Sequence, residues 1–143
     1  MIKKYYQLPL KPDKLIKNMS HDKCSLNASI SSHIHLINTT FFGECSFDES
    51  YGCSIWDIDF DNLSNVNKIK ENISKSLLNS LKEHEKRLTS VAIEVKIKQE
   101  ELTSEIKSMI VKKKVTIRVK ATIVKTSEKF FYEEHFYIGP LSY

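Results

Sequence analysis

The sequence predicts a single-domain α+β fold, with two main helices packed on an antiparallel β-meander sheet. Two helix-like stretches come first along the chain, and three strand-like stretches follow them. Helices and strands that are separated in this way are typical of α+β domains, in which the helices cover one face of the sheet. At 143 residues the chain has the length of one domain, and such a domain buries roughly two thirds of the surface that its unfolded form exposes.

The longest predicted element lies in the stretch from about Leu63 to Leu88, which predicts one helix that stops at a short charged signature, residues 85–88. Its apolar residues recur at steps of three and four, which places them on one helix face: Val66, Ile69, Ile73, Leu77 and Leu81. From Val91 to Ile97 the apolar period becomes two, which is typical of a strand. The charged signature Glu85-Lys86-Arg87-Leu88 therefore lies at the corner between helix and sheet. Such a corner can project the charges of Glu85 and Arg87 in fixed directions, as a docking surface requires.

Residues 1–24 are predicted to form an extended N-terminal lead, because Pro9 and Pro12 stand there among lysines. Aromatic and apolar residues near its start can pin the lead to a surface, either of this domain or of a partner. The remaining residues, 25–143, are predicted to form the folded domain.

The domain is predicted to begin with a helix from about Ser25 to Asn38. Its apolar face consists of Leu26, Ile30, Ile34 and Ile37. His33 and His35 flank Ile34 and point in different directions on a helix, so they do not predict a shared metal site.

Residues 39–62 are predicted to form a long loop that is packed by its own aromatic side chains. The acidic residues Asp48, Asp57, Asp59 and Asp61 can suggest calcium. However, the run from Asp57 to Asp61 lacks the glycine and the closing glutamate of an EF-hand loop. No metal and no cofactor are therefore predicted.

Three strands are predicted after the long helix, over Ser90–Lys98, Lys114–Lys125 and Phe130–Ile138, because apolar residues alternate in each. The short connection from Thr126 to Lys129 predicts that the last two strands form an antiparallel hairpin. Between the first two strands, the polar stretch Gln99–Val111 is compatible with a short helix or with the extended arm of a long hairpin.

Charge and composition limit the classes of function. The net charge of +4 comes partly from one strand region with Lys112, Lys113, Lys114, Arg118, Lys120 and Lys125. A solvated strand face explains this cluster better than a nucleic-acid surface, because no aromatic-interleaved or helix-turn-helix motif accompanies it. The three cysteines are odd in number and form no CxxC pair, which favours a reducing compartment. Without a signal peptide or about 18 consecutive apolar residues, a cytoplasmic location and no membrane insertion are expected.

The sequence lacks the short motifs of several enzyme classes, with no glycine-rich phosphate loop, no HExxH and no GxSxG. No small-molecule substrate is predicted. Cys24 and His33 form a conceivable nucleophile pair, yet nothing in the sequence orients them, and a buried structural cysteine is the favoured interpretation. Glu85 has three cationic residues close to it in sequence, and nearby cations favour the ionised carboxylate over a general acid.

Three stretches occur in an order that is found in one protein family. Ser29–Thr40 with Gly43-Glu44 is similar to a helix that ends in "LLNTRxGE", and Tyr51-Gly52 with Trp56-Asp57 resembles a "YGxPD" loop. Glu85-Lys86-Arg87-Leu88 resembles an "EPR" signature before a strand, with Lys86 in place of the proline. Together they resemble the TssE family of type VI secretion baseplate proteins and its relatives among phage baseplate wedge proteins, which carry a lysozyme-like label. The resemblance covers roughly Leu26 to Ile138.

The resemblance implies a non-enzymatic structural protein of a contractile injection baseplate, in the cytoplasm at the inner face of the cell envelope. Its partners would be the other wedge subunits and the base of the contractile sheath, whose first ring it would help to seat. Glu85, Lys86, Arg87 and Leu88 would form the partner-binding site, with no catalytic residue and no metal. The free edge of a three-stranded sheet also suits strand addition by a neighbouring chain.

Other interpretations stay open at this stage. The lysozyme-like label suggests a peptidoglycan muramidase with Glu85 as general acid, although no partner carboxylate is evident. The basic strand suggests a nucleic-acid binder, whose affinity would depend on salt. An ordinary helix-end ion pair between Glu85 and Arg87, worth under about 1 kcal/mol, is the simplest alternative to a docking site.

Overall fold

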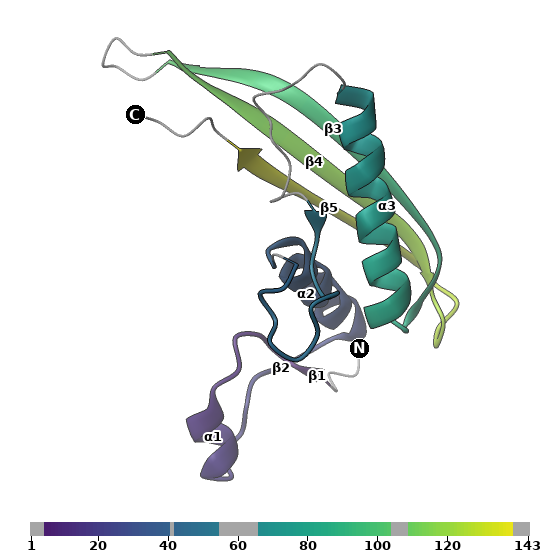
Figure 1. Ribbon diagram of the computed structural model, residues 1–143. Helices are drawn as coiled ribbons and strands as arrows, with labels where there is room; N and C mark the ends of the chain where they lie inside the picture. Colours follow the sequence, from purple (N-terminus) through teal and green to yellow (C-terminus); the bar gives the residue numbers. More distant parts are fainter. Residues whose placement is uncertain (1–4, 41, 55–65, 104–108, 139–143) are drawn as a thin grey trace.

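The chain folds into a three-stranded sheet with two helices on one face and a small N-terminal arm (Figure 1). The computed structural model describes residues 5–40, 42–54, 66–103 and 109–138. In chain order the elements are β1 (Tyr5–Tyr6), α1 (Pro12–Ile16), β2 (Lys23–Cys24), α2 (Leu26–Asn38), α3 (Val66–His84), β3 (Leu88–Thr103), β4 (Met109–Ile123) and β5 (Lys129–Ile138). The predicted α+β class is confirmed.

The main sheet is an antiparallel meander in the order β3-β4-β5. Ile117 of β4 lies opposite Val95 of β3 and Glu134 of β5. The predicted hairpin between the last two strands is thereby confirmed. In the described part of residues 99–111 the chain continues β3 and β4, which stay paired as far as Thr103 opposite Met109. Of the two interpretations of this stretch, the long hairpin is the one that the described residues follow.

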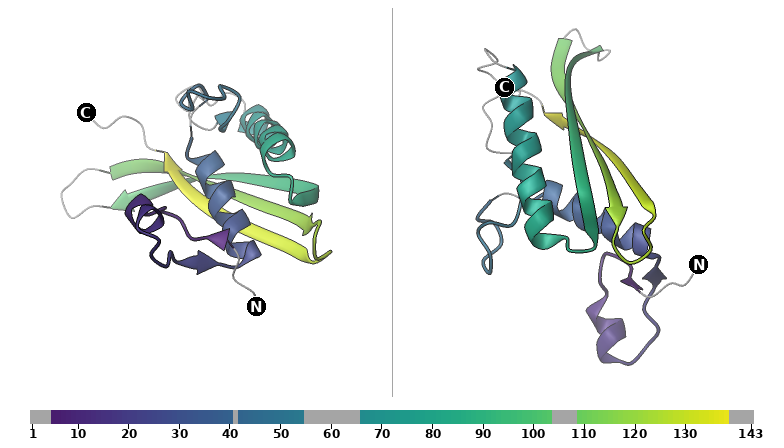
Figure 2. Two further views of the ribbon diagram at one scale, coloured as in Figure 1. Left: turned by 90° about the horizontal axis from the view of Figure 1, so that it is seen from below. Right: turned by 90° about the vertical axis from the view of Figure 1, so that its right-hand side faces the viewer.

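The core lies between the inner face of this sheet and the apolar faces of α2 and α3. The helices contribute fully buried side chains at the positions that the 3.6-residue period predicted: Ile30, Ile34, Ile37, Ile73, Leu77 and Leu81. The middle strand contributes alternate residues: Val115, Ile117, Val119, Ala121 and Ile123. Figure 2 shows α3 running along the β3 side of the sheet and α2 crossing near β5.

The long helix ends just before the charged signature, where the sequence predicted its end. α3 ends at His84, immediately before Glu85, as predicted, and β3 begins at Leu88, two residues before the predicted strand start at Ser90. The Glu85 N–H still donates to the Leu81 carbonyl at 2.9 Å. The Glu85 side chain then accepts the backbone N–H of Arg87 at 3.1 Å, which offers the chain a turn in place of a further helical bond. The predicted start of the helix, residues 63–65, lies outside the described residues.

The N-terminal lead is not extended as predicted, because residues 5–24 fold back on themselves and form what we call the arm. β1 pairs antiparallel with β2, and α1 lies in the connection with Pro12 in its first turn, where a missing N–H is tolerated. The nearly buried His21 closes the arm. Its Nε2 accepts the Lys11 backbone N–H at 2.9 Å, and its Nδ1–H donates to the Asp22 carbonyl at 2.8 Å.

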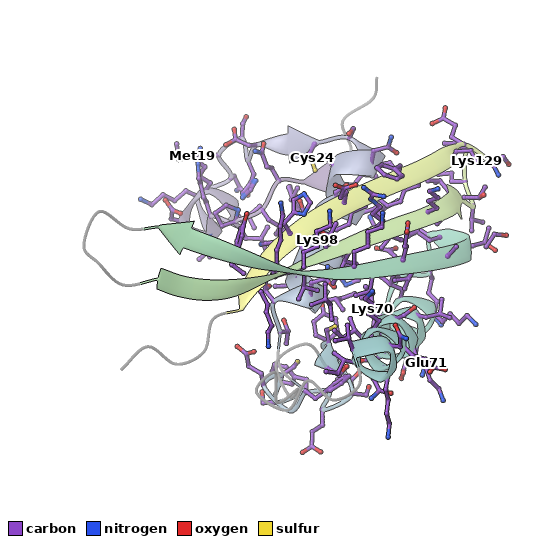
Figure 3. All side chains as sticks on the ribbon, turned by 90° about the horizontal axis from the view of Figure 1, so that it is seen from above. Met19, Cys24, Lys70, Glu71, Lys98 and Lys129 are labelled. Carbon is purple, nitrogen blue, oxygen red and sulfur yellow. The ribbon has the colours of Figure 1, made fainter. Side chains whose placement is uncertain are left out.

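The arm projects beyond one end of the sheet (Figure 2). Seen from above, the arm, marked by Met19 and Cys24, lies beyond the β5 edge of the sheet, and α3, marked by Lys70 and Glu71, lies toward the β3 edge (Figure 3). The Tyr5 ring reaches the short connection between α3 and β3, with its centroid 5.4 Å from the Arg87 guanidinium carbon. The surface that pins the start of the arm therefore belongs to this chain.

The outer face of the sheet is polar, and its charges alternate in sign. Arg118 on β4 donates to Glu133 on β5 at 2.7 Å and lies 3.8 Å from Glu94 on β3. Part of the basic strand cluster is thus paired within the sheet, which favours a solvated strand face over a nucleic-acid surface. No helix in the described part of the chain combines the length and the apolar composition needed to cross a membrane.

Candidate functional site

The signature corner, Glu85 to Leu88, is built around a buried carboxylate. Glu85 follows the last residue of α3 and is only 2% exposed. The Arg87 guanidinium binds this carboxylate through a bidentate pair of hydrogen bonds. Nε donates to Oε1 and Nη2 donates to Oε2, each at 2.7 Å. Two parallel charge-assisted hydrogen bonds of this kind fix orientation as well as distance. The geometry of the corner is therefore fixed by hydrogen bonds between its own side chains, although Lys86 stands where the family pattern has proline.

Helix α2 supplies two more partners of this pair. Ser25 caps the start of α2 by accepting the Ala28 N–H at 3.3 Å, which sets the phase of the helix. Residues 29 and 33 then lie one turn apart on one side. His33 Nδ1–H donates to Glu85 Oε2 at 2.7 Å, and Arg87 Nη1 donates to Ser29 Oγ at 2.9 Å. The Glu85–Arg87 ion pair thus joins α2 to the point where α3 ends and β3 begins. We call these four residues, Ser29, His33, Glu85 and Arg87, the clamp.

The clamp keeps Glu85 ionised. Burial alone would raise the pKa of the Glu85 carboxyl, but hydrogen bonds from Arg87 and His33 outweigh burial and lower this pKa to about 2. The same hydrogen bonds to Glu85 raise the pKa of Arg87. The sequence-based expectation that neighbouring cations favour the charged carboxylate is confirmed. A group with this pKa holds no proton to donate near neutral pH.

The loop that precedes α3 packs against the clamp through Tyr51. Its ring stacks on His33 with centroids 6.0 Å apart and meets the edge of His84 at 4.9 Å. Burial, followed by the charges of Cys45 and Glu85, raises the pKa of Tyr51 to about 12, so its hydroxyl stays neutral. The stretches that carry the family resemblance, on α2, at Tyr51 and at the signature corner, therefore meet in one place.

The other predicted candidates separate in space. His33 contacts Glu85, whereas His35 pairs with Glu134 on β5, so the two histidines face different elements. Asp48 lies 3.8 Å from His84. The remaining acidic residues that suggested calcium, at 57, 59 and 61, and Trp56 lie outside the described residues. Cys24 donates weakly to the Tyr6 carbonyl at 3.7 Å, within the arm.

The four predicted partner-binding residues differ sharply in exposure. Glu85 and Leu88 are 2% and 8% exposed, and both face the interior. The Arg87 side chain is 30% exposed, and Lys86 is exposed, with Nζ donating to the Lys82 carbonyl at 2.9 Å. The corner therefore projects its cations but not its anion, and the expectation that Glu85 also points outward is wrong. The physical reason is that Arg87 and His33 occupy both oxygens of the carboxylate.

Sequence reasoning missed four residues of this region. Ser29 and His33 contact the ion pair from α2, Tyr5 covers Arg87 from the arm, and Lys125 follows β4. Tyr5 and Lys125 also line a pocket of about 200 Å³, together with Leu26, Lys86, Arg87 and Val124. The sequence offers one signal for Ser29 and His33: they are polar residues one helical turn apart, next to the apolar face of α2.

Comparison with known proteins agrees with this geometry. The sequence model of the family described as baseplate wedge protein gp25 matches residues 24–128. No curated protein matches the chain. A crystal structure of a candidate tail lysozyme from Geobacter sulfurreducens has the same fold, with a TM-score of 0.58 and 18% sequence identity. The similarity covers 86% of this chain and 100% of that one.

Proposed function

Because the chain belongs to the baseplate wedge protein gp25 family, we propose that it is a non-enzymatic structural component of a type VI secretion baseplate. In this role it docks on the other wedge subunits, contacts the sheath base and helps to seat the first sheath ring. It works in the cytoplasm at the inner face of the cell envelope. One observation carries the proposal: the family signature forms an internal clamp whose cationic groups face outward.

The residues of the signature corner take different roles in docking. Arg87 and Lys86 are the contact residues, because their side chains reach the surface. Glu85 and Leu88 are positioning residues, which hold that surface from beneath. Glu85 and Ser29 fix the Arg87 guanidinium before a partner arrives, so little side-chain entropy is lost on binding. A preorganised guanidinium makes directed, charge-assisted hydrogen bonds.

The contact with the sheath base is proposed at β5. β5 pairs only with β4 among the described strands, so its other edge carries backbone groups that a neighbouring strand can pair with. Two large side chains on this strand, Phe131 and Tyr137, are 59% and 52% exposed. Exposed aromatic side chains beside an open edge add side-chain contacts to the backbone hydrogen bonds of strand addition.

Peptidoglycan cleavage by Glu85 is disfavoured by the surroundings of this carboxylate. A general acid must hold its proton at the working pH, which requires a raised pKa. The pKa of Glu85 is lowered to about 2, and both of its oxygens accept hydrogen bonds. The candidate tail lysozyme shares the fold, at an identity of 18%. We therefore expect the pure chain to release no soluble fragments from purified peptidoglycan.

That expectation is checked by a turbidity assay on purified peptidoglycan with wild type and Glu85→Gln. Equal, background rates for both proteins are the expected result. Turnover by the wild type that disappears in Glu85→Gln, in a sample whose folding is verified by circular dichroism, would show that the muramidase alternative is correct.

Docking is tested by co-expression of the tagged chain with the wedge proteins of its own baseplate. The exposed Lys86 is changed to glutamate, and Lys75→Glu serves as a matched control, because Lys75 is exposed on α3 away from the corner. We expect wild type and Lys75→Glu to retain the wedge proteins, and Lys86→Glu to retain at least about tenfold less. The new glutamate would carry the same sign of charge as the anionic partner group that we expect to face Lys86. Equal retention by all three proteins rules out the corner as the docking site.

A further inference from the structure

The small pocket beside the signature corner is lined by the arm, α2, the corner and the turn after β4. Its volume of about 200 Å³ has room for a side chain and is too small for a helix. Lys86, Arg87 and Lys125 give it three cationic side chains, and Tyr5, Leu26 and Val124 give it apolar walls. Such a site selects a group that carries negative charge on a short apolar stem.

The positive charge of the pocket comes chiefly from its two lysines. The charge of Arg87 is balanced by Glu85, whose carboxylate oxygen lies 2.7 Å from Nε. Within the described residues no ion pair joins Lys86 or Lys125 to a carboxylate. The Lys86 ammonium donates only to a backbone carbonyl, that of Lys82. Two cations that have no carboxylate partner among the described residues, around one small pocket, attract an anion, and more strongly once water is displaced.

The apolar side of the pocket is held in place by contacts that do not need a ligand. The Val124 N–H donates to the Arg87 carbonyl at 2.9 Å, which fixes the turn after β4 against the signature corner. The Tyr5 ring lies over the Arg87 guanidinium, a cation–π contact. Val124 is 58% exposed, so apolar surface is available for the stem of an incoming side chain.

We propose that this pocket takes the side-chain carboxylate of a glutamate or aspartate from a wedge subunit. The inference rests on the proposed docking function and deepens it, because it names the chemistry of the partner and adds Tyr5 and Lys125 to the site. Tyr5 lies outside residues 24–128, the part that matches the family model. The pocket is therefore completed by a residue outside the part of the chain that matches the family model.

A phosphate or a nucleic-acid backbone fits the pocket less well. These ligands have no apolar stem to cover Leu26 and Val124, and nucleic acid is bound along an extended basic track rather than in one small pocket. The carboxylate of a protein side chain satisfies both the lysines and the apolar wall.

The first arm of the experiment measures the affinity of the full chain for the co-purified wedge proteins by biolayer interferometry. The variants are Lys125→Glu, Lys125→Met and Tyr5→Ala, with Lys75→Glu as the matched control. We expect Lys125→Glu to weaken binding at least about tenfold, Lys125→Met by less, and wild-type affinity to fall as salt rises. Unchanged affinity in Lys125→Glu and Tyr5→Ala, while wild type binds, overturns the inference and leaves the docking function standing.

The second arm works without a wedge protein, so it separates failure of the pocket from failure of the proposed function. An acetylated hexaglutamate peptide is titrated into the isotope-labelled full chain, and the amide signals of Val124 and Lys125 are followed by NMR. A saturable shift with hexaglutamate that is lost in Lys125→Glu and absent with hexaglutamine supports the inference. No shift in the wild type, or equal shifts with inorganic phosphate or with anionic phosphatidylglycerol vesicles, overturns it.

Discussion

Glu85→Gln is expected to lower the free energy of unfolding at pH 7 by about 3 kcal/mol, the cost of leaving a clamped cation without its counter-charge. Glutamine keeps the shape of the side chain but offers one acceptor oxygen where the carboxylate offers two. Its amide NH₂ would face a donor of Arg87 or of His33. Urea unfolding followed by circular dichroism measures the change. Glu71→Gln, at an exposed residue of α3, is the matched control and should stay within about 0.5 kcal/mol of wild type.

The pH dependence of this effect follows from the lowered pKa. The pKa of the Glu85 carboxyl falls from 4.5 to about 2 on folding, and each pKa unit corresponds to about 1.4 kcal/mol. A carboxyl group whose pKa is lower in the folded state stabilises the protein fully at pH values above its unfolded-state pKa. This stabilisation is lost as the pH falls toward the folded-state pKa. The difference in stability between wild type and Glu85→Gln should therefore shrink between pH 4.5 and about 2. A difference that does not change over this window contradicts the ionised clamp.

Arg87→Met is expected to lower the free energy of unfolding by about 3–4 kcal/mol, as much as Glu85→Gln or more, because it leaves a buried carboxylate without its cation. Only His33 and the backbone would then hydrogen-bond Glu85, whose pKa should rise. Chemical unfolding at pH 7 gives the stability, and Lys86→Met, at the exposed neighbouring residue, is the control.

The double variant Glu85→Gln/Arg87→Met isolates the pair itself. Its loss of stability should be smaller than the sum of the two single losses by about 1–3 kcal/mol, because the second substitution removes a partner that is already unpaired. Additive losses would mean that Glu85 and Arg87 act independently, as in an ordinary helix-end ion pair.

These stability effects change how docking at the signature corner has to be tested. A variant such as Glu85→Ala can lose its partners merely because α2 separates from the corner. Substitutions at Lys86 and Lys125 avoid this problem, since both side chains are exposed and neither hydrogen-bonds the carboxylate. Loss of binding in these variants, with unchanged thermal unfolding, reports on the surface alone.

Much of the fold could be predicted from the sequence because local periodicity and burial agree. Ile30, Ile34 and Ile37 on α2 and the alternating residues of β4 are buried as their spacing predicted. The hairpin of β4 and β5 followed from a short connection. The stretch from residue 99 to 111 was ambiguous because its apolar spacing fits both a helix and a strand. In its described part, residues 99–103 and 109–111, strand pairing decides for the strand.

The site could be predicted only in part, because its decisive contacts join distant residues. The signature corner was identified, but His33 and Glu85 are 52 positions apart, and no local pattern announces their hydrogen bond. Without knowledge of that bond, the sequence around Glu85 predicts an exposed carboxylate. The arm was missed for a similar reason: His21 bonds to Lys11 across ten positions and folds a proline-rich segment that reads as extended.

Glu85 is held as an ionised internal ion-pair partner, and this role excludes both acid catalysis and direct surface contact. The most direct test is a ¹³C NMR pH titration of the Glu85 side-chain carboxyl carbon in the wild-type chain. We expect the chemical shift of this carbon to report an ionised carboxylate down to about pH 3, in keeping with a pKa of about 2. A titration midpoint at or above 4.5, the ordinary value for the group, would contradict it.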